Sequence, residues 1–292
     1  MRVERRAVPR RGIPLRALVP NAVTVLALCF GLTGVYFAIS AAGGVAANWE
    51  KAIAAIVIAG VLDGLDGRIA RMLKAQTRFG AELDSLSDVI AFGVAPAIIL
   101  YLWSLEGLPR FGWIFALAHV VCCALRLARF NANIDAEEQP HKSAGFLTGV
   151  PAPAGAGLLL LPLYIWMATG ESLFREVYIT APWAALVAFL MISNVATYSW
   201  SLLRVRQQAR LGLLVVVALV GAALFAAPWE TLSVVALIYV AFIPFSIAGY
   251  ARIRRQRAAA SISPAAARQP AAPAAAPPAR PSRRRRSPPS SP

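Results

Sequence analysis

Charged residues are scarce in this sequence, because Asp, Glu, Lys and Arg make up only 15% of it, whereas 58% is hydrophobic. A water-soluble domain typically has about 25% charged and about 45–50% apolar residues. Only two histidines and three cysteines occur, and no pair of cysteines has the Cys-x-x-Cys spacing of a metal or redox site. These shortages argue against a soluble globule, disorder over most of the chain and a disulfide framework.

Acidic residues are also few, at 14 against 29 lysines and arginines, which gives a formal charge of +15. The excess is concentrated at the end of the chain, where residues 252–292 hold ten arginines and no acid. A basic excess confined to a tail does not indicate a nucleic-acid-binding domain, and we expect no nucleic-acid partner. The tail is rich in Ala, Pro, Ser and Arg, which predicts disorder and favours attraction to anionic membrane lipids.

Long apolar runs dominate the remainder of the chain. A helix needs about 20 apolar residues to cross a bilayer, and most of these runs lack a polar face of period 3.6. The sequence therefore predicts an all-α polytopic membrane protein with about eight transmembrane helices. Their approximate ranges are 18–40, 51–73, 82–104, 111–131, 150–169, 180–199, 211–227 and 231–250.

The basic residues predict how these helices are oriented and how the chain is divided. All but three of the 29 lysines and arginines lie in the N-terminal segment, in alternate connections or in the tail. Because basic connections stay on the cytoplasmic side, we expect a multi-pass protein of a bacterial-type inner membrane with both termini in the cytoplasm. The expected parts are a basic cytoplasmic segment (1–17), a membrane domain (18–250) and a disordered cytoplasmic tail (251–292).

Four of the five aspartates lie between residues 63 and 88, next to apolar segments. An acid inside a membrane helix costs at least about 2.5–3.5 kcal/mol, so such residues indicate function. Asp63 and Asp66 stand at i and i+3 on one helix, and Asp84 and Asp88 stand at i and i+4 on the next. Two antiparallel helices would bring all four carboxylates together near the cytoplasmic end.

Four clustered carboxylates without histidine or cysteine favour a hard divalent cation over zinc. The small residues Gly67, Ala70 and Gly80 leave room for a ligand, and Arg71 is placed to meet a phosphate. An ion or metal transporter is the alternative from another class, because intramembrane carboxylates also line transport paths. The arginines beside the acids argue against transport.

Residues 66–88 read Asp-Gly-x2-Ala-Arg-x8-Gly-x3-Asp-x3-Asp, and Asp63 precedes them. This pattern resembles the signature of the CDP-alcohol phosphatidyltransferase family at every fixed position. The resemblance implies a CDP-linked lipid donor, an alcohol acceptor and two divalent cations, Mg²⁺ or Mn²⁺. The implied cation ligands are Asp63, Asp66, Asp84 and Asp88.

The resemblance also implies how the nucleotide is bound. Gly67, Arg71 and Thr77 match the positions that contact the nucleotide and its phosphates. The segment that contains Asn21 and Thr24 is similar to the opening segment of the family, where the cytidine side is bound. Members of the family often form dimers, so a homodimer is implied as well.

Three further stretches, 84–96, 126–131 and 146–154, resemble the phosphatidylserine synthase branch of the family. This likeness implies transfer of a phosphatidyl group from CDP-diacylglycerol to L-serine, with release of CMP and with Asp88 as the base. Glycerol 3-phosphate, inositol phosphate and choline remain as alternative acceptors.

The acceptor residues follow from the expected topology. Serine carries a carboxylate, which an arginine fork binds at two points. We expect Arg126, Arg129, Asn131 and Lys142 to lie at the level of the aspartates, and the last three are the candidate acceptor contacts.

Overall fold

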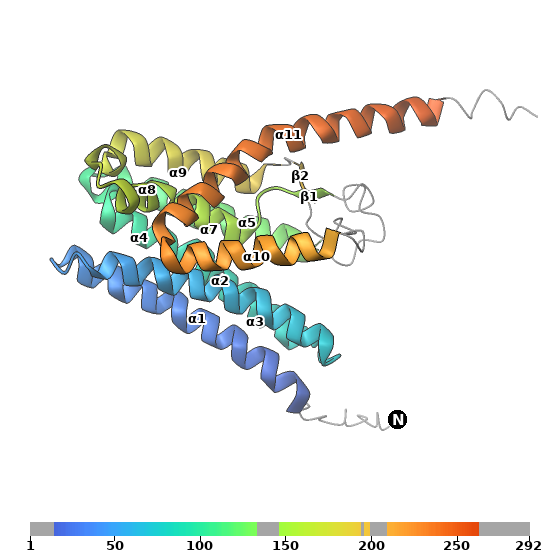
Figure 1. Cartoon of the computed structure of the whole chain (residues 1–292), viewed down its shortest axis with the longest axis horizontal. Helices are drawn as coiled ribbons and strands as arrows, with labels where there is room; N and C mark the ends of the chain where they lie inside the picture. Colours follow the sequence, from blue (N-terminus) through green and yellow to red (C-terminus); the bar gives the residue numbers. More distant parts are fainter. Residues whose placement is uncertain (1–14, 133–145, 194–195, 199–208, 263–292) are drawn as a thin grey trace, which may run out of the picture. The chain divides into compact units, whose positions relative to one another are not determined.

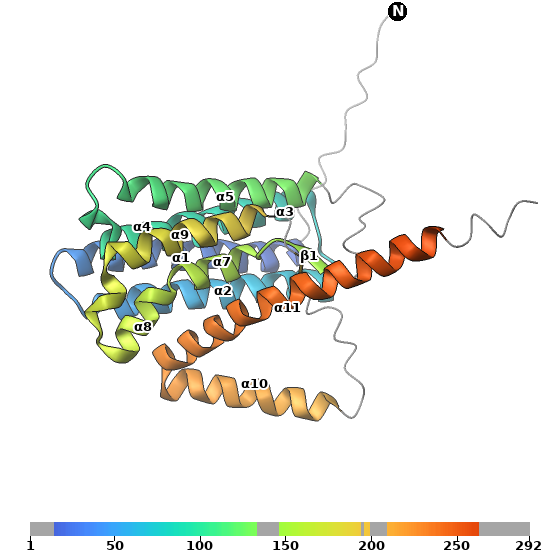
Figure 2. The ribbon, with the colours of Figure 1, turned by 90° about the horizontal axis from the view of Figure 1, so that it is seen from above.

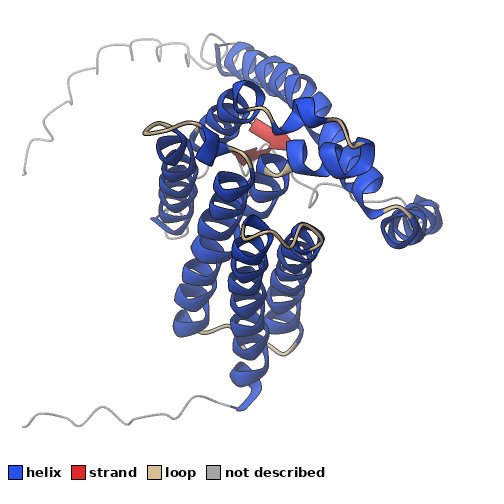
Figure 3. Cartoon of the chain, turned by 90° about the vertical axis from the view of Figure 1, so that its left-hand side faces the viewer, coloured by secondary structure: helices blue, strands red, loops and turns tan. Residues whose placement is uncertain are grey.

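The computed structural model describes residues 15–132, 146–193, 196–198 and 209–262, and these residues are almost entirely helical (Figures 1 and 3). One short ribbon interrupts the helices: β1 (Phe146–Thr148) pairs antiparallel with β2 (Ala196–Tyr198). The long helices of the first half are α1 (Leu15–Ala42), α2 (Asn48–Met72), α3 (Arg78–Asp88), α4 (Ala95–Trp103) and α5 (Gly112–Ala132). Those of the second half are α7 (Ala152–Leu159), α8 (Leu161–Thr169), α9 (Val177–Ile192), α10 (Ala209–Ala226) and α11 (Pro228–Ile262).

The helices α1 and α2 form an antiparallel hairpin through close contacts between small residues. A Cβ on Gly34 would lie 3.1 Å from the backbone oxygen of Ala52, so the two helices approach more closely than larger residues would allow. Ala38, Ala52 and Ala59 are fully buried at this contact or beside it. The hairpin therefore brings the C-terminal turns of α2 back to the end of the bundle where α1 begins.

The next membrane segment is one continuous helical stretch, Arg78–Trp103, with an irregular turn in its middle. Thr77 begins it, because its Oγ1 accepts a hydrogen bond from the backbone N–H of Gly80 at 3.0 Å. The turn is a π-helix, η1 (Val89–Val94), which separates α3 from α4. The side chains of α3 and those of α4 are therefore rotated about the helix axis relative to each other, compared with a straight α-helix.

The core lies around α4 and the helices that surround it. Phe92, Ile99, Leu100 and Trp103 are almost completely buried in it, together with the Leu159–Leu161 stretch where α7 meets α8. α5 packs against α9 on one side of this core, as Figure 2 shows. Because α4 is buried in the core, it holds the preceding segments α3 and η1 in position.

The end of the bundle where α4 finishes is held by hydrogen bonds between three elements. The Ser104 hydroxyl donates to the backbone oxygen of Arg175 at 2.7 Å and lies 2.7 Å from the hydroxyl of Thr180. Arg175 lies in the short 3₁₀-helix η3 (Ser172–Arg175), and its Nε donates to the backbone oxygen of Trp103 at 2.9 Å. These bonds join α4, η3 and α9 at the end opposite to Asp84.

The described helices confirm a helical membrane architecture. Four helices are long and apolar enough to cross a bilayer, and a fifth span results if α7 and α8, which meet at 42°, are counted together. α2 has the length, but its 25 residues include six charged ones. The segments α9 and Leu214–Ala226 are shorter than 18 residues. The number of about eight spans therefore stays a prediction.

The chain divides into two compact units, residues 1–250 and 251–292. The expected change to a disordered tail at 251 does not match the described part of the second unit, because α11 runs on to Ile262. Alanine and arginine are strong helix formers, and they extend an existing helix without a new nucleation step. The residues beyond 262, like Lys142 and the first 14 residues, lie outside the described part of the chain.

Candidate metal and nucleotide site

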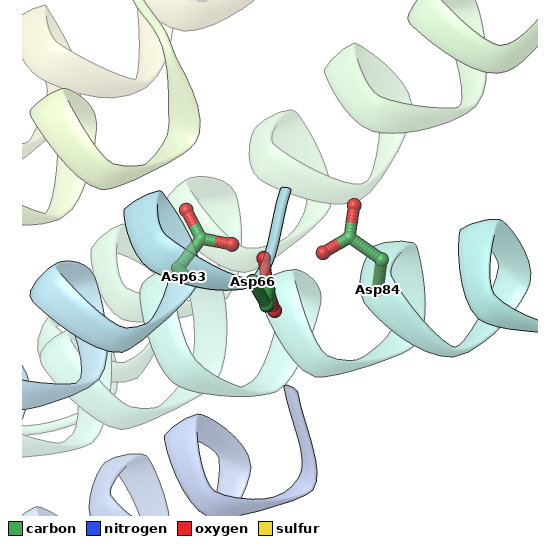
Figure 4. A group of neighbouring side chains, drawn as sticks. All are labelled: Asp63, Asp66 and Asp84. Atoms are coloured by element: carbon green, nitrogen blue, oxygen red, sulfur yellow. The ribbon is translucent and has the colours of Figure 1, made fainter. Parts of the chain in front are cut away.

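Three of the four predicted metal ligands come together where α2 and α3 lie side by side. Asp63, Asp66 and Asp84 each offer one carboxylate oxygen, and these oxygens lie within 4.8 Å of one another. Figure 4 shows the side chains of Asp63 and Asp84 pointing toward each other from the two helices, with Asp66 between them. The helical spacing within the motif therefore produces the predicted cluster.

Asp66 is the buried member of this cluster, with 4% of its surface exposed. The Thr24 hydroxyl of α1 donates a hydrogen bond of 2.6 Å to its Oδ2. The backbone oxygen of Thr24 accepts from the Ser87 hydroxyl of α3 at 3.2 Å. α1 therefore holds both acidic helices, and Thr24 fixes the orientation of one ligand.

Asp88 lies outside the group of three but contacts it. Its carboxyl group shares a hydrogen bond with that of Asp63. It also interacts electrostatically with Arg126 and Cys123 of α5. Asp88 thus stands between the acidic cluster and the basic end of α5.

The donor set fits a hard divalent cation. Hard cations bind carboxylate oxygens at about 2.0–2.6 Å, so two ligands of one ion are separated by no more than about 5 Å. The spacing of the three carboxylate oxygens lies within that limit. A divalent cation would also offset the repulsion among four carboxylates that face one another. Asp63, Asp66 and Asp84 are the residues that would hold it.

The residues predicted to bind the nucleotide gather around the start of α3. Asn21 lies against Gly80, since a Cβ at that glycine would come within 2.9 Å of the Asn21 Oδ1. The Thr77 hydroxyl, which caps the helix, lies 3.2 Å from the same point. A side chain at position 80 would therefore push both polar groups away.

Gly67 and Arg71 occupy the exposed face of the last turns of α2. No atom lies within 4 Å of the place that a Cβ on Gly67 would take, so a ligand can approach the backbone there. The Arg71 Nε donates to the backbone oxygen of Gly67 at 3.0 Å, and the Arg71 side chain is exposed. Gly67 directly follows Asp66, and Arg71 lies one to two turns beyond Asp66 and Asp63.

Two of the three predicted acceptor residues lie at the same end of the bundle. The Asn131 amide donates to the Ser85 hydroxyl at 2.8 Å, and Ser85 is next to Asp84. The Nη1 of Arg129 donates to the backbone oxygen of Ile192 at 3.1 Å, which joins α5 to α9. Lys142, the third candidate, lies outside the described residues.

Sequence reasoning gave no role to Ser87 and did not choose Arg126 as a substrate contact, although both contact the site. Ser87 lies between two aspartates in the motif and has a buried bond to α1, which only its position next to Asp88 could have suggested. Arg126 is half-buried beside Asp88, and its buried Nε has no hydrogen-bond partner within the described part of the chain. Arg126 was expected at the level of the aspartates, and its place one helical turn before Arg129 was the signal for a shared role.

Comparison with protein families places most of the chain in one family. The model for CDP-alcohol phosphatidyltransferases matches residues 17–197, and a second model, CDP-alcohol phosphatidyltransferase 2, matches residues 208–244. The first match contains the whole acidic cluster, the predicted nucleotide residues and the basic end of α5.

Curated relatives with the name CDP-diacylglycerol–serine O-phosphatidyltransferase are similar over most of the chain. The protein from Mycobacterium bovis is 40% identical over 238 residues, which cover 82% of this chain and 80% of the relative. The protein from Helicobacter pylori is 32% identical over 231 residues, covering 77% and 89%. The protein from Methanocaldococcus jannaschii is 40% identical over 136 residues, covering 46% and 57%.

Proposed function

Because the chain belongs to the CDP-alcohol phosphatidyltransferase family, we propose that it transfers a phosphatidyl group from CDP-diacylglycerol to L-serine. The serine hydroxyl oxygen forms a bond to the phosphorus of the phosphatidyl group, the bond from that phosphorus to CMP breaks, and phosphatidylserine and CMP are the products. The observation that carries this proposal is the cluster of Asp63, Asp66 and Asp84, which stands within a match to relatives named for the same reaction.

Two divalent cations, Mg²⁺ or Mn²⁺, are the proposed cofactors, and Asp63, Asp66, Asp84 and Asp88 are their proposed ligands. When bound, such cations neutralise a diphosphate and make its phosphorus more susceptible to attack. The carboxylates fix where this charge stands, and Thr24 and Ser87 hold two of the helices that carry them.

The donor is proposed to lie against the exposed side of the cluster. Gly67 gives its diphosphate access to the α2 backbone, and the terminal nitrogens of Arg71 bind a phosphate oxygen. Asn21 and Thr77 lie together at the start of α3 and provide polar contacts for the cytidine side. Thr24, in the segment proposed to bind the cytidine side, also fixes Asp66.

Asp88 is the proposed base, because a serine hydroxyl is a poor nucleophile until its proton is taken up. Its carboxyl stands between Asp63 and Arg126. A proton leaves the serine hydroxyl as the new bond to phosphorus forms, and a carboxylate oxygen of Asp88 receives it.

The serine carboxylate is proposed to bind at the basic end of α5. Arg126 and Arg129 stand at i and i+3 and thus share a helix face, and Asn131 is held over Ser85. Among the described residues the buried Nε of Arg126 has no hydrogen-bond partner, and a substrate carboxylate would satisfy it. Lys142 is the further proposed contact.

The same proposal places the protein in a bacterial-type inner membrane with about eight helical crossings and with both termini and the site in the cytoplasm. Arg68, Arg71, Lys74, Arg126 and Arg129 all lie at the end of the bundle that carries the aspartates, which supports this orientation under the positive-inside rule. Residues 18–250 form the proposed membrane domain. A homodimer is proposed on family grounds alone.

The test is a product assay on the full chain in detergent micelles that contain CDP-diacylglycerol. CMP release should require both L-serine and Mg²⁺ or Mn²⁺, and removal of the cation with a chelator should stop it. Glycerol 3-phosphate, inositol phosphate and choline serve as competing acceptors, and Asp84→Asn serves as the inactive control. CMP release with one of these acceptors but none with serine would contradict the proposed acceptor. Cation uptake into vesicles without CMP release would contradict the proposal that the protein is an enzyme and would favour a transporter.

A further inference from the structure

The π-helix η1 begins at the residue that follows Asp88, so it joins the acidic part of the helix to its buried part. The backbone N–H of Ala95 donates to the oxygen of Ile90, five residues earlier, instead of the oxygen four residues earlier as in an α-helix. Such π-turns are rare and frequently occur at functional sites. The insertion of one residue changes the direction of the side chains on either side by about 100°.

Pro96 gives a physical reason for this turn. In a regular α-helix, the backbone oxygen of Phe92 would accept from the N–H of residue 96, but proline has no N–H and its ring clashes with that oxygen. Widening the helix relieves the clash, and the Phe92 oxygen is without the α-helical donor that residue 96 would otherwise provide. Phe92 is 2% exposed, so water does not readily provide that donor.

His119 of α5 supplies it. The His119 Nε2 lies 3.2 Å from the backbone oxygen of Phe92, and because a carbonyl only accepts, Nε2 carries the proton. The ring is completely buried, and its Nδ1 has no partner among the described residues. A buried ring with an unsatisfied nitrogen is costly, and neither a cation ligand nor a predicted substrate contact accounts for it.

Close contacts hold η1 from two sides. A Cβ on Gly31 of α1 would come 2.8 Å from the Cα of Ala91, and a Cβ on Gly93 would come 3.2 Å from the Cβ of Cys123. His119 and Cys123 stand at i and i+4 and so present one face of α5 to the turn. The turn is therefore packed on two sides, and its remaining freedom is rotation about the helix axis.

We propose that His119 is a positioning residue for Asp88: by binding the Phe92 backbone oxygen it holds the π-turn and so fixes the direction in which Asp88 and Asp84 face Asp63. The inference rests on the proposed function in one respect, which is that these aspartates hold a divalent cation. It does not depend on the identity of the acceptor.

Two substitutions at position 119 separate the effect of the hydrogen-bond donor from the effect of the side-chain volume. His119→Leu fills the space without a donor, whereas the amide of His119→Gln can place an N–H near the position of Nε2. Thr180→Val is the matched control, because Thr180 is also completely buried and hydrogen-bonded. It lies beyond the last turn of α4, about 20 Å along the helix from Asp88 at 1.5 Å per residue. Electron paramagnetic resonance measures Mn²⁺ binding to the full chain in detergent without substrate. The kcat, the KM for each substrate and the thermal unfolding temperature are measured on the same variants.

His119→Leu should weaken Mn²⁺ binding and lower kcat, each by about tenfold or more, the range found when a group that orients metal ligands is removed. His119→Gln should recover most of both, and Thr180→Val should lower the unfolding temperature without either loss. Mn²⁺ binding by folded His119→Leu at the unmodified level, or equal losses in the Gln and Leu variants, would overturn the inference. If the unmodified chain binds Mn²⁺ but shows no serine-dependent CMP release, the proposed function fails while the binding comparison still decides the inference.

Discussion

Each carboxylate of the acidic cluster has a different neighbour, and these neighbours assign different tasks to similar side chains. Asp66 is buried and accepts from Thr24, whereas Asp88 shares a hydrogen bond with Asp63 and faces Arg126. Asp84 stands on α3 opposite the other two cluster members. An oxygen that a neighbouring group already holds suits a fixed cation ligand. A carboxyl beside the Arg126 side chain suits proton transfer to it from a bound substrate.

Replacing a cluster aspartate by asparagine should abolish most turnover. Asp63→Asn, Asp66→Asn and Asp84→Asn keep the side-chain shape but lose the charge that binds a cation, and we expect kcat to fall by at least about a hundredfold, the upper end of what indirect changes at metal sites cost. Initial rates of CMP release measure this, and Glu82→Gln is the control because Glu82 is exposed on the same helix. Near-normal rates in any two of the asparagine variants would contradict the metal site.

Arg126→Lys and Arg129→Lys should raise the KM for serine about tenfold while the KM for CDP-diacylglycerol changes little. Lysine keeps the charge but loses the two-point fork to a carboxylate, and a lost hydrogen bond to a charged group costs about 1.5–3 kcal/mol. Steady-state kinetics with each substrate varied in turn separates the two effects. Arg110→Lys, in a loop before α5, is the control. An equal rise in both KM values would assign these arginines to the donor instead.

At the scale of the helices, the position of the site depends on how closely α1 approaches η1. The contact between Gly31 and Ala91 leaves no room for a Cβ. Gly31→Ala should therefore force the helices apart and destabilise the protein by about 1–3 kcal/mol, the usual cost of overpacking a core. Thermal unfolding in detergent measures it. Gly221→Ala in α10, where a Cβ would meet nothing within 4 Å, should stay within about 1 kcal/mol of the unmodified protein. Equal stability of the two variants would show that the contact between α1 and η1 can accommodate an added methyl group.

The sequence predicts the helices better than it predicts their interruptions. The segment expected at 82–104 begins at Arg78, because Thr77 caps it, and its apolar residues give no periodic signal for the π-turn inside it. Pro96 was the only indication of that turn. In the same way, the range 150–169 was expected as one helix, but α7 ends at Leu159 and α8 begins at Leu161. Irregular turns depend on backbone groups and tertiary neighbours that hydropathy does not register.

The acidic cluster was predictable because its spacings are local. Residues at i and i+3 or i+4 share a helix face in any α-helix, so Asp63 with Asp66 and Asp84 with Asp88 needed only an antiparallel pair. The topology predicts Arg126 at the level of the aspartates but not its pairing with Asp88, because no periodicity relates residues on two helices that are 38 positions apart in the chain. Such contacts are decided by the packing of α5 on η1.

For the whole molecule, the distribution of basic residues predicts its orientation. In a cysteine-free variant, Ala46→Cys between α1 and α2 should react with a membrane-impermeant thiol reagent added to intact spheroplasts, because it lies in the exposed connection opposite the basic end. Gln76→Cys, which is exposed between α2 and α3, should react only after the membrane is opened. Reaction of Gln76→Cys in intact spheroplasts would reverse the proposed topology.

Removing the residues after Ile262 should leave turnover in neutral detergent within about twofold of the full chain, because the cluster and its supporting helices all lie before that point. The truncation removes six arginines, each worth about 1 kcal/mol of attraction near an anionic membrane. Stimulation of turnover by anionic lipid vesicles should therefore decrease. A large loss of turnover in neutral detergent would give the tail a direct role in catalysis.

The hydrogen bonds around the acidic cluster link five helices in succession. α2 is joined to α1 through Thr24, α1 to α3 through Ser87, α3 to α5 through Asn131, and α5 to α9 through Arg129. The helices around the cluster are therefore ordered when the chain folds, before a cation binds, so the site is preorganised. Small metal domains that fold only around their ion pay the entropic cost of that ordering on binding. In this protein, loading the cation should bury little new apolar surface, and the accompanying heat-capacity change should be close to zero.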